Sequence, residues 1–300
     1  MNVTWPRPMA AGDKIAILSP ASIIKEEYVT GAVETLGRFG FAHEVMPHTL
    51  GRLGSYSGSR RERLADFESA CSLPDIRAIM CSRGGYGAVH LLDALDKLPL
   101  EDDPKWLIGF SDVSALHALM AKHGIVSIHA SMAKGMCRGV GNHLNRMLVE
   151  MLRGERPGMA GEMSVFNRTG TGRGVLRGGN LAVLDGLFGT PFNDIVPGCI
   201  LVIEDIAEPI YKIERMLYRL KLSGVLNRLS GLIVGAFTEY KADSNFETME
   251  EMINEMLGAV DFPVAFGAPI GHIEENTPWF HNALACLTVT PCGWTLSYID

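Results

Sequence analysis

Short apolar runs alternate with amphipathic stretches through the first half of this 300-residue chain. Residues 14–19 (KIAILS) form the first run, closed by Pro20, and the amphipathic stretch 25–39 that follows ends at Gly40. Strands that alternate with helices of about ten to fifteen residues are typical of a parallel sheet, which binds ligands beyond the carboxyl ends of its strands. We therefore expect an α/β fold. The expected strands are 14–19, 42–46, 76–81, 106–109 and 126–128, and the expected helices are 25–39, 60–71, 88–98, one that ends at Lys122, and 143–152.

The second half of the chain has a different pattern. Residues 154–174 are rich in Gly, Thr and Arg without clean periodicity, which favours a linker that could act as a mobile flap. We expect an N-terminal domain at 1–153, this linker at 154–174, and a C-terminal domain at 175–300. The C-terminal elements that we expect are a short helix opened by Gly178-Gly179-Asn180, helices 211–222 and 246–257, strands 199–204, 229–236, 264–268, 283–290 and 295–299, and a hairpin turn at Pro291-Cys292-Gly293.

Composition excludes several classes of protein. A hydrophobic content of 47% is ample for packed cores, and the length favours two domains. The formal net charge of -7, with a pI near 5.7, argues against nucleic acid or an anionic membrane surface as the main partner, so we expect a small ligand. No window approaches ~18 unbroken apolar residues, and residues 1–13 lack an apolar signal core, which indicates a soluble cytoplasmic protein. No C-x-x-C pair occurs among the six cysteines, so we expect no metal: they are Cys71, Cys81, Cys137, Cys199, Cys286 and Cys292.

A serine stands where one apolar run gives way to a helix. The run 107–110 ends at Ser111, and the residues that follow predict a helix to Lys122. A serine at such a turn projects its hydroxyl from the sheet edge, and the next backbone N–H points at the helix's positive end, which is how a nucleophile is displayed. The alternative is a plain N-cap role for Ser111 or Asp112, which this window alone favours. The pattern is not the G-x-S-x-G elbow, because Val113 stands where glycine is required.

A serine nucleophile needs a base and a carboxylate that orients the base. His272 follows Pro269-Ile270-Gly271 after an apolar strand, and Glu204 and Asp205 terminate another. All three are at strand ends, where sheets present sites. A generic surface turn would explain each one alone. Other histidines sit in helices or beside apolar runs, where a surface or core role is expected: His90, His117 and His143.

A glycine-rich turn follows the third strand. Residues 82–87 (SRGGYG) leave a strand and enter a helix, with glycines where backbone must approach a ligand closely. Such a turn can supply the N–H donors that stabilise a developing oxyanion, at roughly 3 kcal/mol per donor. Phosphate binding is the rival interpretation, but G-G-Y-G is not G-x-G-x-x-G and does not follow the first strand.

Four motifs, in their order and spacing, resemble the LD-carboxypeptidase family of serine peptidases, which includes murein tetrapeptide carboxypeptidases and microcin C immunity proteins. They are 83–87 (RGGYG), 109–112 (GFSD), 204–206 (EDI) with Glu208, Tyr211 and Arg215, and 271–272 (GH). The resemblance runs from about Lys14 to the C-terminus.

The resemblance implies a role for each matching residue. Ser111 is expected as nucleophile, His272 as general base and acid, and Glu204 as the carboxylate that orients His272. The N–H groups of Asp112 and of Gly85, or of Gly84 in its place, are expected as the oxyanion hole.

The resemblance also implies the fold: an N-terminal parallel-sheet domain of flavodoxin/Rossmann-like type, and a C-terminal mixed α/β domain with a β-barrel-like sheet. Family members are usually cytoplasmic homodimers and need no metal or cofactor. Two departures could reshape the pocket. The family often has His-Gly-Pro where this chain has His129-Ala130-Ser131, and Pro-x-Gly where it has Pro278-Trp279-Phe280.

Three functions stay open. The first is a serine carboxypeptidase that releases a terminal D-amino acid from cytoplasmic muropeptides. The second is hydrolysis of a peptidyl-nucleotide antibiotic, for which an aromatic residue in the linker would favour base stacking; Phe166 is the only aromatic there. The third is a non-catalytic small-molecule binding protein.

We expect Arg83, Gly84 and Tyr86 to contact substrate. A bidentate guanidinium suits a free terminal carboxylate. Arg83 could instead pair structurally with Asp112 or Glu208.

Overall fold

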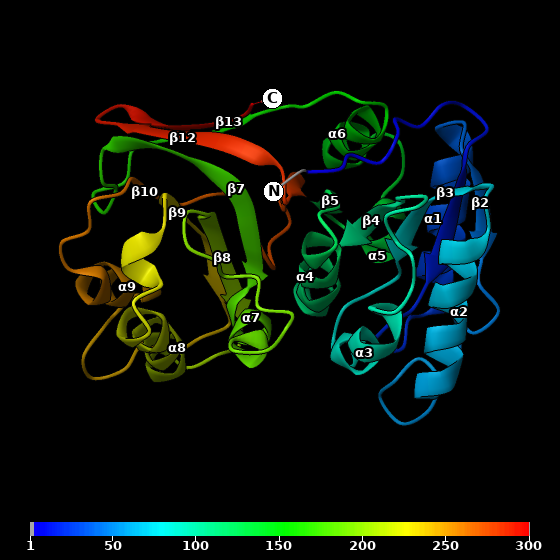
Figure 1. Ribbon diagram of the computed structural model, residues 1–300, viewed down its shortest axis with the longest axis horizontal. Coiled ribbons are helices and arrows are strands. Elements are labelled where there is room, and N and C mark those ends of the chain that lie inside the picture. The colour runs from blue at the N-terminus through cyan, green and yellow to red at the C-terminus, as the bar shows by residue number, and fades with distance from the viewer. Residues whose placement is uncertain (1–2, 300) are drawn as a thin grey trace. The chain divides into compact units, whose positions relative to one another are not determined.

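The computed structural model describes residues 3–299, which form two compact units (Figure 1). The first unit runs up to Arg156 and includes the later segment Thr277–His281. The second consists of Pro157–Asn276 and the residues from Asn282 on. Over residues 3–299, no helix has both the length and the apolar character needed to cross a membrane.

The first unit contains a six-stranded sheet in the order β11-β5-β4-β3-β1-β2. Its strands run parallel except β11, which pairs with β5 in the antiparallel direction. β3 and β4 are buried along their whole length, as expected for parallel strands covered on both faces. The expected parallel α/β fold is therefore confirmed, with one antiparallel strand added. The strands are β1 (Lys14–Leu18), β2 (Ala42–Val45), β3 (Ile76–Cys81), β4 (Trp106–Gly109), β5 (Ser127–His129) and β11 (Trp279–His281).

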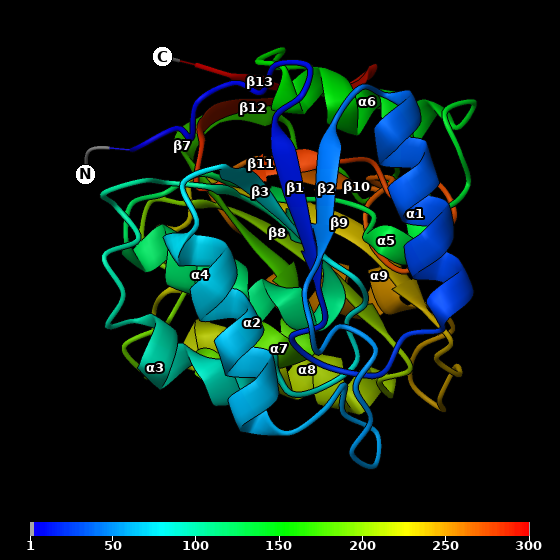
Figure 2. The ribbon, with the colours of Figure 1, turned by 90° about the vertical axis from the view of Figure 1, so that its right-hand side faces the viewer.

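Helices cover both faces of this sheet. Figure 2 shows α2, α3 and α4 on one side of the strands and α1 and α5 on the other. A capping box starts α2: Ser59 Oγ accepts the Glu62 N–H, and the Glu62 carboxylate accepts the Ser59 N–H. Residues 88–98, expected as one helix, form a 3-10 turn at Ala88–Leu91 and the short α3 instead. The helices are α1 (Glu26–Arg38), α2 (Arg60–Ser72), α3 (Leu92–Leu95), α4 (Ser114–Lys122), α5 (Ala133–Met136) and α6 (His143–Leu152).

The second unit contains a seven-stranded sheet in the order β10-β9-β8-β7-β12-β13-β6. The strands from β10 to β7 run parallel and the others antiparallel, so the sheet is mixed, as expected. No pairing between described residues joins β10 to β6, so the sheet stays open and does not close into a barrel. The strands are β6 (Met159–Gly161), β7 (Gly170–Asn180), β8 (Ile200–Ile206), β9 (Gly231–Thr238), β10 (Val264–Phe266), β12 (Leu284–Thr290) and β13 (Gly293–Tyr298).

Helices α7 (Leu181–Leu187), α8 (Ile210–Leu222) and α9 (Met249–Leu257) lie on one face of the parallel part of this sheet (Figure 1). Asn180 starts α7, because its side chain accepts the Val183 N–H. Buried apolar side chains from the three helices and from β8 and β9 form one core, which includes Leu184, Leu217 and Ile253. This core supports the carboxyl end of β8, where Glu204 lies.

Candidate active site

Ser111 lies in a tight, strained turn at the carboxyl end of β4. The strand ends at Gly109, Phe110 is extended, and Ser111 begins a short 3-10 turn that leads into α4. Ser111 has φ 66°, a left-handed conformation that costs a non-glycine residue about 1–2 kcal/mol and is concentrated at functional sites. The predicted strand-to-helix turn is present. The N-cap residues are Phe110 and Val113, and neither caps through its side chain, so Ser111 is not a plain N-cap.

The glycine turn lies beside Ser111, because β3 and β4 are neighbours and their carboxyl ends meet at one edge. A Cβ added at Gly84 would lie 2.8 Å from Ser111 Cβ and 3.0 Å from its Oγ. At Gly85, which has φ 107°, an added Cβ would overlap Ser22 Oγ. Gly84 is therefore the glycine that contacts the serine, whereas Gly85 packs on Ser22.

Ser22 holds the glycine turn from the loop after β1. Its N–H donates to Gly84 O at 3.3 Å, and its Oγ accepts the Tyr86 N–H at 3.2 Å. Sequence reasoning missed this residue. The one available signal was its position just past the carboxyl end of β1, at the same edge as β3 and β4.

The Asp112 carboxylate ties the serine turn to the glycine turn. It is 4% exposed, and its Oδ2 accepts the Ala88 N–H at 2.8 Å. Burial raises the pKa of Asp112 to about 6, although the Ala88 and Gly87 N–H groups and the charge of Arg63 act in the opposite direction. Arg63, on α2, donates to Gly87 O at 2.9 Å and to Pro20 O at 2.6 Å, so it braces the same turn.

Arg83 and Tyr86 are exposed at this edge of the first unit. Arg83 Nη1 donates to Ile23 O at 3.2 Å. The alternative in which Arg83 pairs with Asp112 is wrong, because the Asp112 carboxylate accepts the Ala88 N–H instead. Contact of Arg83 and Tyr86 with substrate stays a prediction.

Glu204 and His272 form a hydrogen-bonded pair in the second unit. His272 Nδ1 lies 2.8 Å from Glu204 Oε2, and the Glu204 side chain is fully buried. A carboxylate only accepts, so Nδ1 carries the proton and the neutral ring has its lone pair on Nε2. Burial alone would lower the pKa of His272, but the hydrogen bond and charge of Glu204, with the charges of Asp205 and Glu239, outweigh it and raise that pKa.

The backbone at Gly271 makes room for this pair. Gly271 has φ 125°, and a Cβ there would lie 3.0 Å from Glu204 Oε2. Asn276, which is 1% exposed, accepts the Gly271 N–H on its Oδ1 at 2.9 Å. Sequence reasoning missed Asn276, since nothing in its motif distinguishes it from a loop asparagine.

Asp205 and Glu208 are the other two carboxylates near Glu204 in sequence that could orient the histidine, and both bond to other groups. Asp205 accepts from Asn180 Nδ2 at 2.9 Å and from the Ala182 N–H at 2.8 Å, at the start of α7. Burial raises its pKa to about 6. Glu208 pairs with Lys212 at 3.2 Å.

The two departures from the family's usual pattern pack against each other in the first unit. Trp279 on β11 pairs with His129 on β5, and the two rings stack with centroids 5.0 Å apart. His117, as expected, is a core histidine: its Nε2 lies 2.9 Å from Gly109 O and its Nδ1 2.7 Å from Ser127 Oγ.

Family models identify both halves of the chain. The model of the LD-carboxypeptidase N-terminal domain matches residues 15–130, and that of the C-terminal domain matches residues 173–287. The chain belongs to the LD-carboxypeptidase family and is a carboxypeptidase.

Individual relatives agree with this assignment. The chain is 31% identical to the murein tetrapeptide carboxypeptidase of Pseudomonas aeruginosa, over 94% of this chain and 95% of the relative. It is 29% identical to the microcin C7 self-immunity protein of Escherichia coli, over 88% and 87%. The crystal structure of muramoyltetrapeptide carboxypeptidase from Oxalobacter formigenes superposes with a TM-score of 0.87 at 27% identity, covering 96% of this chain and 99% of that one.

Proposed function

We propose that this protein is a serine carboxypeptidase that hydrolyses an L,D peptide bond and releases a terminal D-amino acid from muropeptides during peptidoglycan recycling in the cytoplasm. The observation that carries the proposal is the 2.8 Å hydrogen bond between His272 and Glu204, in a chain whose Ser111 has φ 66°. The 31% identity with a murein tetrapeptide carboxypeptidase over nearly the whole chain supports this substrate class.

In the proposed reaction, Ser111 Oγ attacks the carbonyl carbon of the scissile bond, and His272 Nε2 takes the hydroxyl proton. Glu204 keeps the imidazole in the required tautomer and stabilises the imidazolium. His272 then gives its proton to the leaving amine of the D-amino acid. A water molecule, activated by the same base, hydrolyses the acyl-serine ester and restores the enzyme.

The negative charge that develops on the carbonyl oxygen needs N–H donors. The Asp112 N–H follows the proposed nucleophile directly, and Gly84 lies against Ser111. These observations support a hole formed by Asp112 with Gly85 or Gly84, each donor lowering the barrier by roughly 3 kcal/mol. Asp112 and Arg63 brace the turn, so the donors are held in place before the reaction begins.

A carboxypeptidase must distinguish a free terminal carboxylate from a continuing chain. We assign this role to Arg83, which is exposed and, of its five guanidinium N–H donors, uses one in the bond to Ile23 O. The Arg83→Lys variant should fold normally yet lose most activity on tetrapeptide. Equal cleavage of the free acid and of its C-terminal amide by wild type would contradict terminal-carboxylate recognition.

The direct test is release of D-alanine from an LD-tetrapeptide, measured for wild type and Ser111→Ala. We expect Ser111→Ala to lower turnover by several orders of magnitude, and a fluorophosphonate probe to label Ser111 in wild type. Wild-type-like activity in Ser111→Ala would end the serine mechanism. An absence of both labelling and turnover would favour the binding-protein alternative.

Hydrolysis of a peptidyl-nucleotide is the second candidate, favoured by the 29% identity with the microcin C7 self-immunity protein. Phe166 argues against it. Its ring packs on Phe266 with centroids 5.6 Å apart and joins the core of the second unit, so it is not displayed for base stacking. A nucleotide conjugate cleaved faster than tetrapeptide would reverse this ranking. We further propose a homodimer, which light scattering would test.

A further inference from the structure

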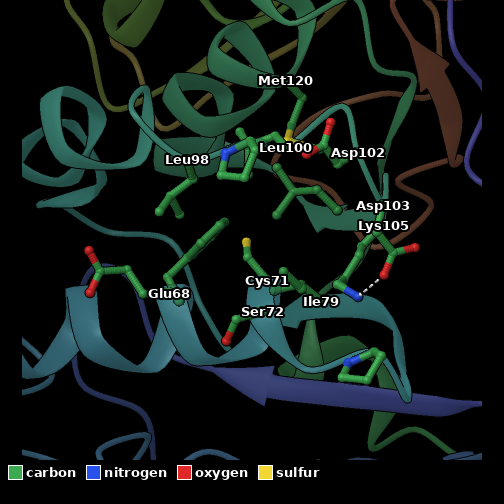
Figure 3. Close-up of a pocket in the computed structure, with 14 residues that line it drawn as sticks. Glu68, Cys71, Ser72, Ile79, Leu98, Leu100, Asp102, Asp103, Lys105 and Met120 are labelled. Carbon is green, nitrogen blue, oxygen red and sulfur yellow. Dashed lines mark hydrogen bonds and ion pairs between the residues drawn. The ribbon is translucent and has the colours of Figure 1, made fainter.

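A hollow of about 340 Å³ lies in the first unit (Figure 3), and its lining includes residues that closely precede β4 and β3. It is lined by the last two turns of α2 and by the segment between α3 and β4. Lys105 and Pro74, which precede β4 and β3, also line it. Ser111 and the glycine turn follow the carboxyl ends of these same strands, so the hollow is separate from the candidate active site.

Most of the residues that line the hollow are apolar. Figure 3 shows the Cys71 sulfur pointing into the space toward Leu98 and Leu100. Phe67 and Met120 complete this part of the lining. Ligand pockets are typically concave, mostly apolar and about 300–1,000 Å³ in volume. The hollow is therefore large enough for an aromatic or branched aliphatic group.

The one lysine in the lining has no proton to offer a ligand. Lys105 is 4% exposed, and its Nζ donates to Leu73 O at 2.9 Å, Ile76 O at 2.8 Å and Asp103 Oδ2 at 2.7 Å. An ammonium group has three donors, so all are used. Asp103 also accepts from Arg77 at 2.7 Å, so this cluster of two cations and one carboxylate keeps one net positive charge, on buried side chains that are already bonded.

Two further carboxylates stand on opposite sides of the hollow. Figure 3 shows Glu68 at one side and Asp102 at the other. Within residues 3–299, neither carboxylate forms an ion pair or a side-chain hydrogen bond. The charges still available to a ligand are therefore negative. The Cys71 thiol adds none, because burial raises its pKa to about 12 and keeps it protonated.

We propose that this hollow is a second ligand site, which takes a small apolar molecule bearing an ammonium group. The apolar part would lie against Phe67, Cys71 and Leu100, and the ammonium group would face Glu68 or Asp102. Anionic apolar molecules would be rejected, since Lys105 is saturated and the two carboxylates repel them.

The test compares 2-phenylethylamine with phenylacetate on the full-length protein, following the methionine methyl NMR signals at low salt. The Met120 signal is assigned from a Met120→Leu variant. We expect the amine to shift this signal saturably, with a dissociation constant of about 1 mM or below. Phenylacetate should bind at least about tenfold more weakly.

Three variants locate the site. Cys71→Phe fills the hollow and should abolish the shift. The double variant Glu68→Gln with Asp102→Asn should weaken amine binding about three- to tenfold. Asp93→Asn, an exposed acid that does not line the hollow, should bind as wild type does.

Absence of a saturable shift with the amine would overturn the proposal, and so would equal binding of phenylacetate. Binding that survives in Cys71→Phe would place the ligand elsewhere and overturn it as well. If Cys71→Phe fails to fold, the surface double variant decides, because it leaves the apolar wall intact. None of these readouts depends on carboxypeptidase activity.

Discussion

At the scale of single residues, the orientation of His272 depends on three neighbours in the second unit. Glu204 Oε2 fixes Nδ1 at 2.8 Å, Gly271 leaves room for that oxygen, and Asn276 Oδ1 holds the Gly271 N–H at 2.9 Å. Each contact acts on the imidazole through the next. A substitution at any of the three should therefore change the position of the His272 ring, the proposed base.

Glu204→Gln should lower kcat by about 10³–10⁴-fold, because an amide can donate to Nδ1 and so favour the wrong tautomer. Asp205→Asn should change kcat by less than about tenfold, since Asp205 bonds to Asn180 and Ala182 at the start of α7. Steady-state kinetics of the two variants make the comparison. A larger loss in Asp205→Asn would show that the other strand-end carboxylate orients the base.

The pH dependence of the reaction should report the pKa of His272. In the proposed mechanism only the neutral imidazole accepts the Ser111 proton, so kcat/KM should fall at acidic pH with an inflection above the ordinary value of 6.5. In Glu204→Gln the carboxylate is gone while burial remains, so the inflection in the residual activity should move to lower pH. An unchanged inflection in that variant would assign the acidic limb to another group.

At the scale of elements, most strands and helices of the parallel part could be predicted from periodicity. Three strands could not. β7 contains glycines at 170, 172, 174, 178 and 179, which indicate a loop when taken alone. In the structure they allow close approach: an added Cβ at Gly172 or Gly174 would overlap Ser230 O or Gly198 O. β6 (MAG) lies within the glycine-rich segment expected as a linker, and β11 (WFH) pairs with β5, a strand far away in sequence, so neither leaves a local signal.

Some residues of the candidate site could likewise be predicted from the sequence, and others could not. The turn at Ser111 could be predicted, because a buried strand that ends at a polar residue leaves a local signal. Ser22 and Arg63 could not, because each bonds to a backbone group that lies 64 or 24 residues away in sequence. Asn276 bonds to the Gly271 N–H only five residues before it, but nothing in its motif distinguishes it from a loop asparagine. Such contacts place no constraint on the local pattern around the residue that makes them.

The glycine turn offers a prediction at this scale. Gly84→Ala would place a Cβ 2.8 Å from Ser111 Cβ, which real Cβ contacts do not show, so the serine turn must shift. We expect kcat to fall about 10²-fold or more, because small misplacements of reacting groups are costly. Gly37→Ala is the matched control. Gly37 lies in α1 with nothing within 4 Å of an added Cβ, so alanine there should leave kcat unchanged and raise the free energy of unfolding by up to about 1 kcal/mol. Equal kcat values for the two variants would show that Gly84 does not constrain the serine turn.

At the scale of the whole molecule, two separate segments of the chain form its first unit. After Asn276 it contributes β11 to the sheet of the first unit, and from Asn282 it returns to the second. β11 is buried throughout: Trp279 stacks on His129, and the Phe280 ring lies 5.0 Å from Trp5 and 5.7 Å from Trp106. The first unit is thus completed by residues that lie about 120 positions beyond its main segment.

A fragment that ends at Arg156 should therefore fail to form the native first unit. Burial of Trp279 and Phe280 contributes up to about 8–12 kcal/mol, which is comparable to the whole stability of a domain. Without them, the β5 edge and the aromatic rings around it would be exposed to water. Trp279→Ala in the full-length protein is the control, because it removes one ring and keeps the strand. This variant should lose about 3–5 kcal/mol of unfolding free energy and remain folded. Denaturant unfolding, followed by far-UV circular dichroism, compares the fragment and the Trp279→Ala variant with the full-length protein. A cooperative transition in the fragment, at the denaturant midpoint of the full-length protein, would show that the first unit does not depend on β11.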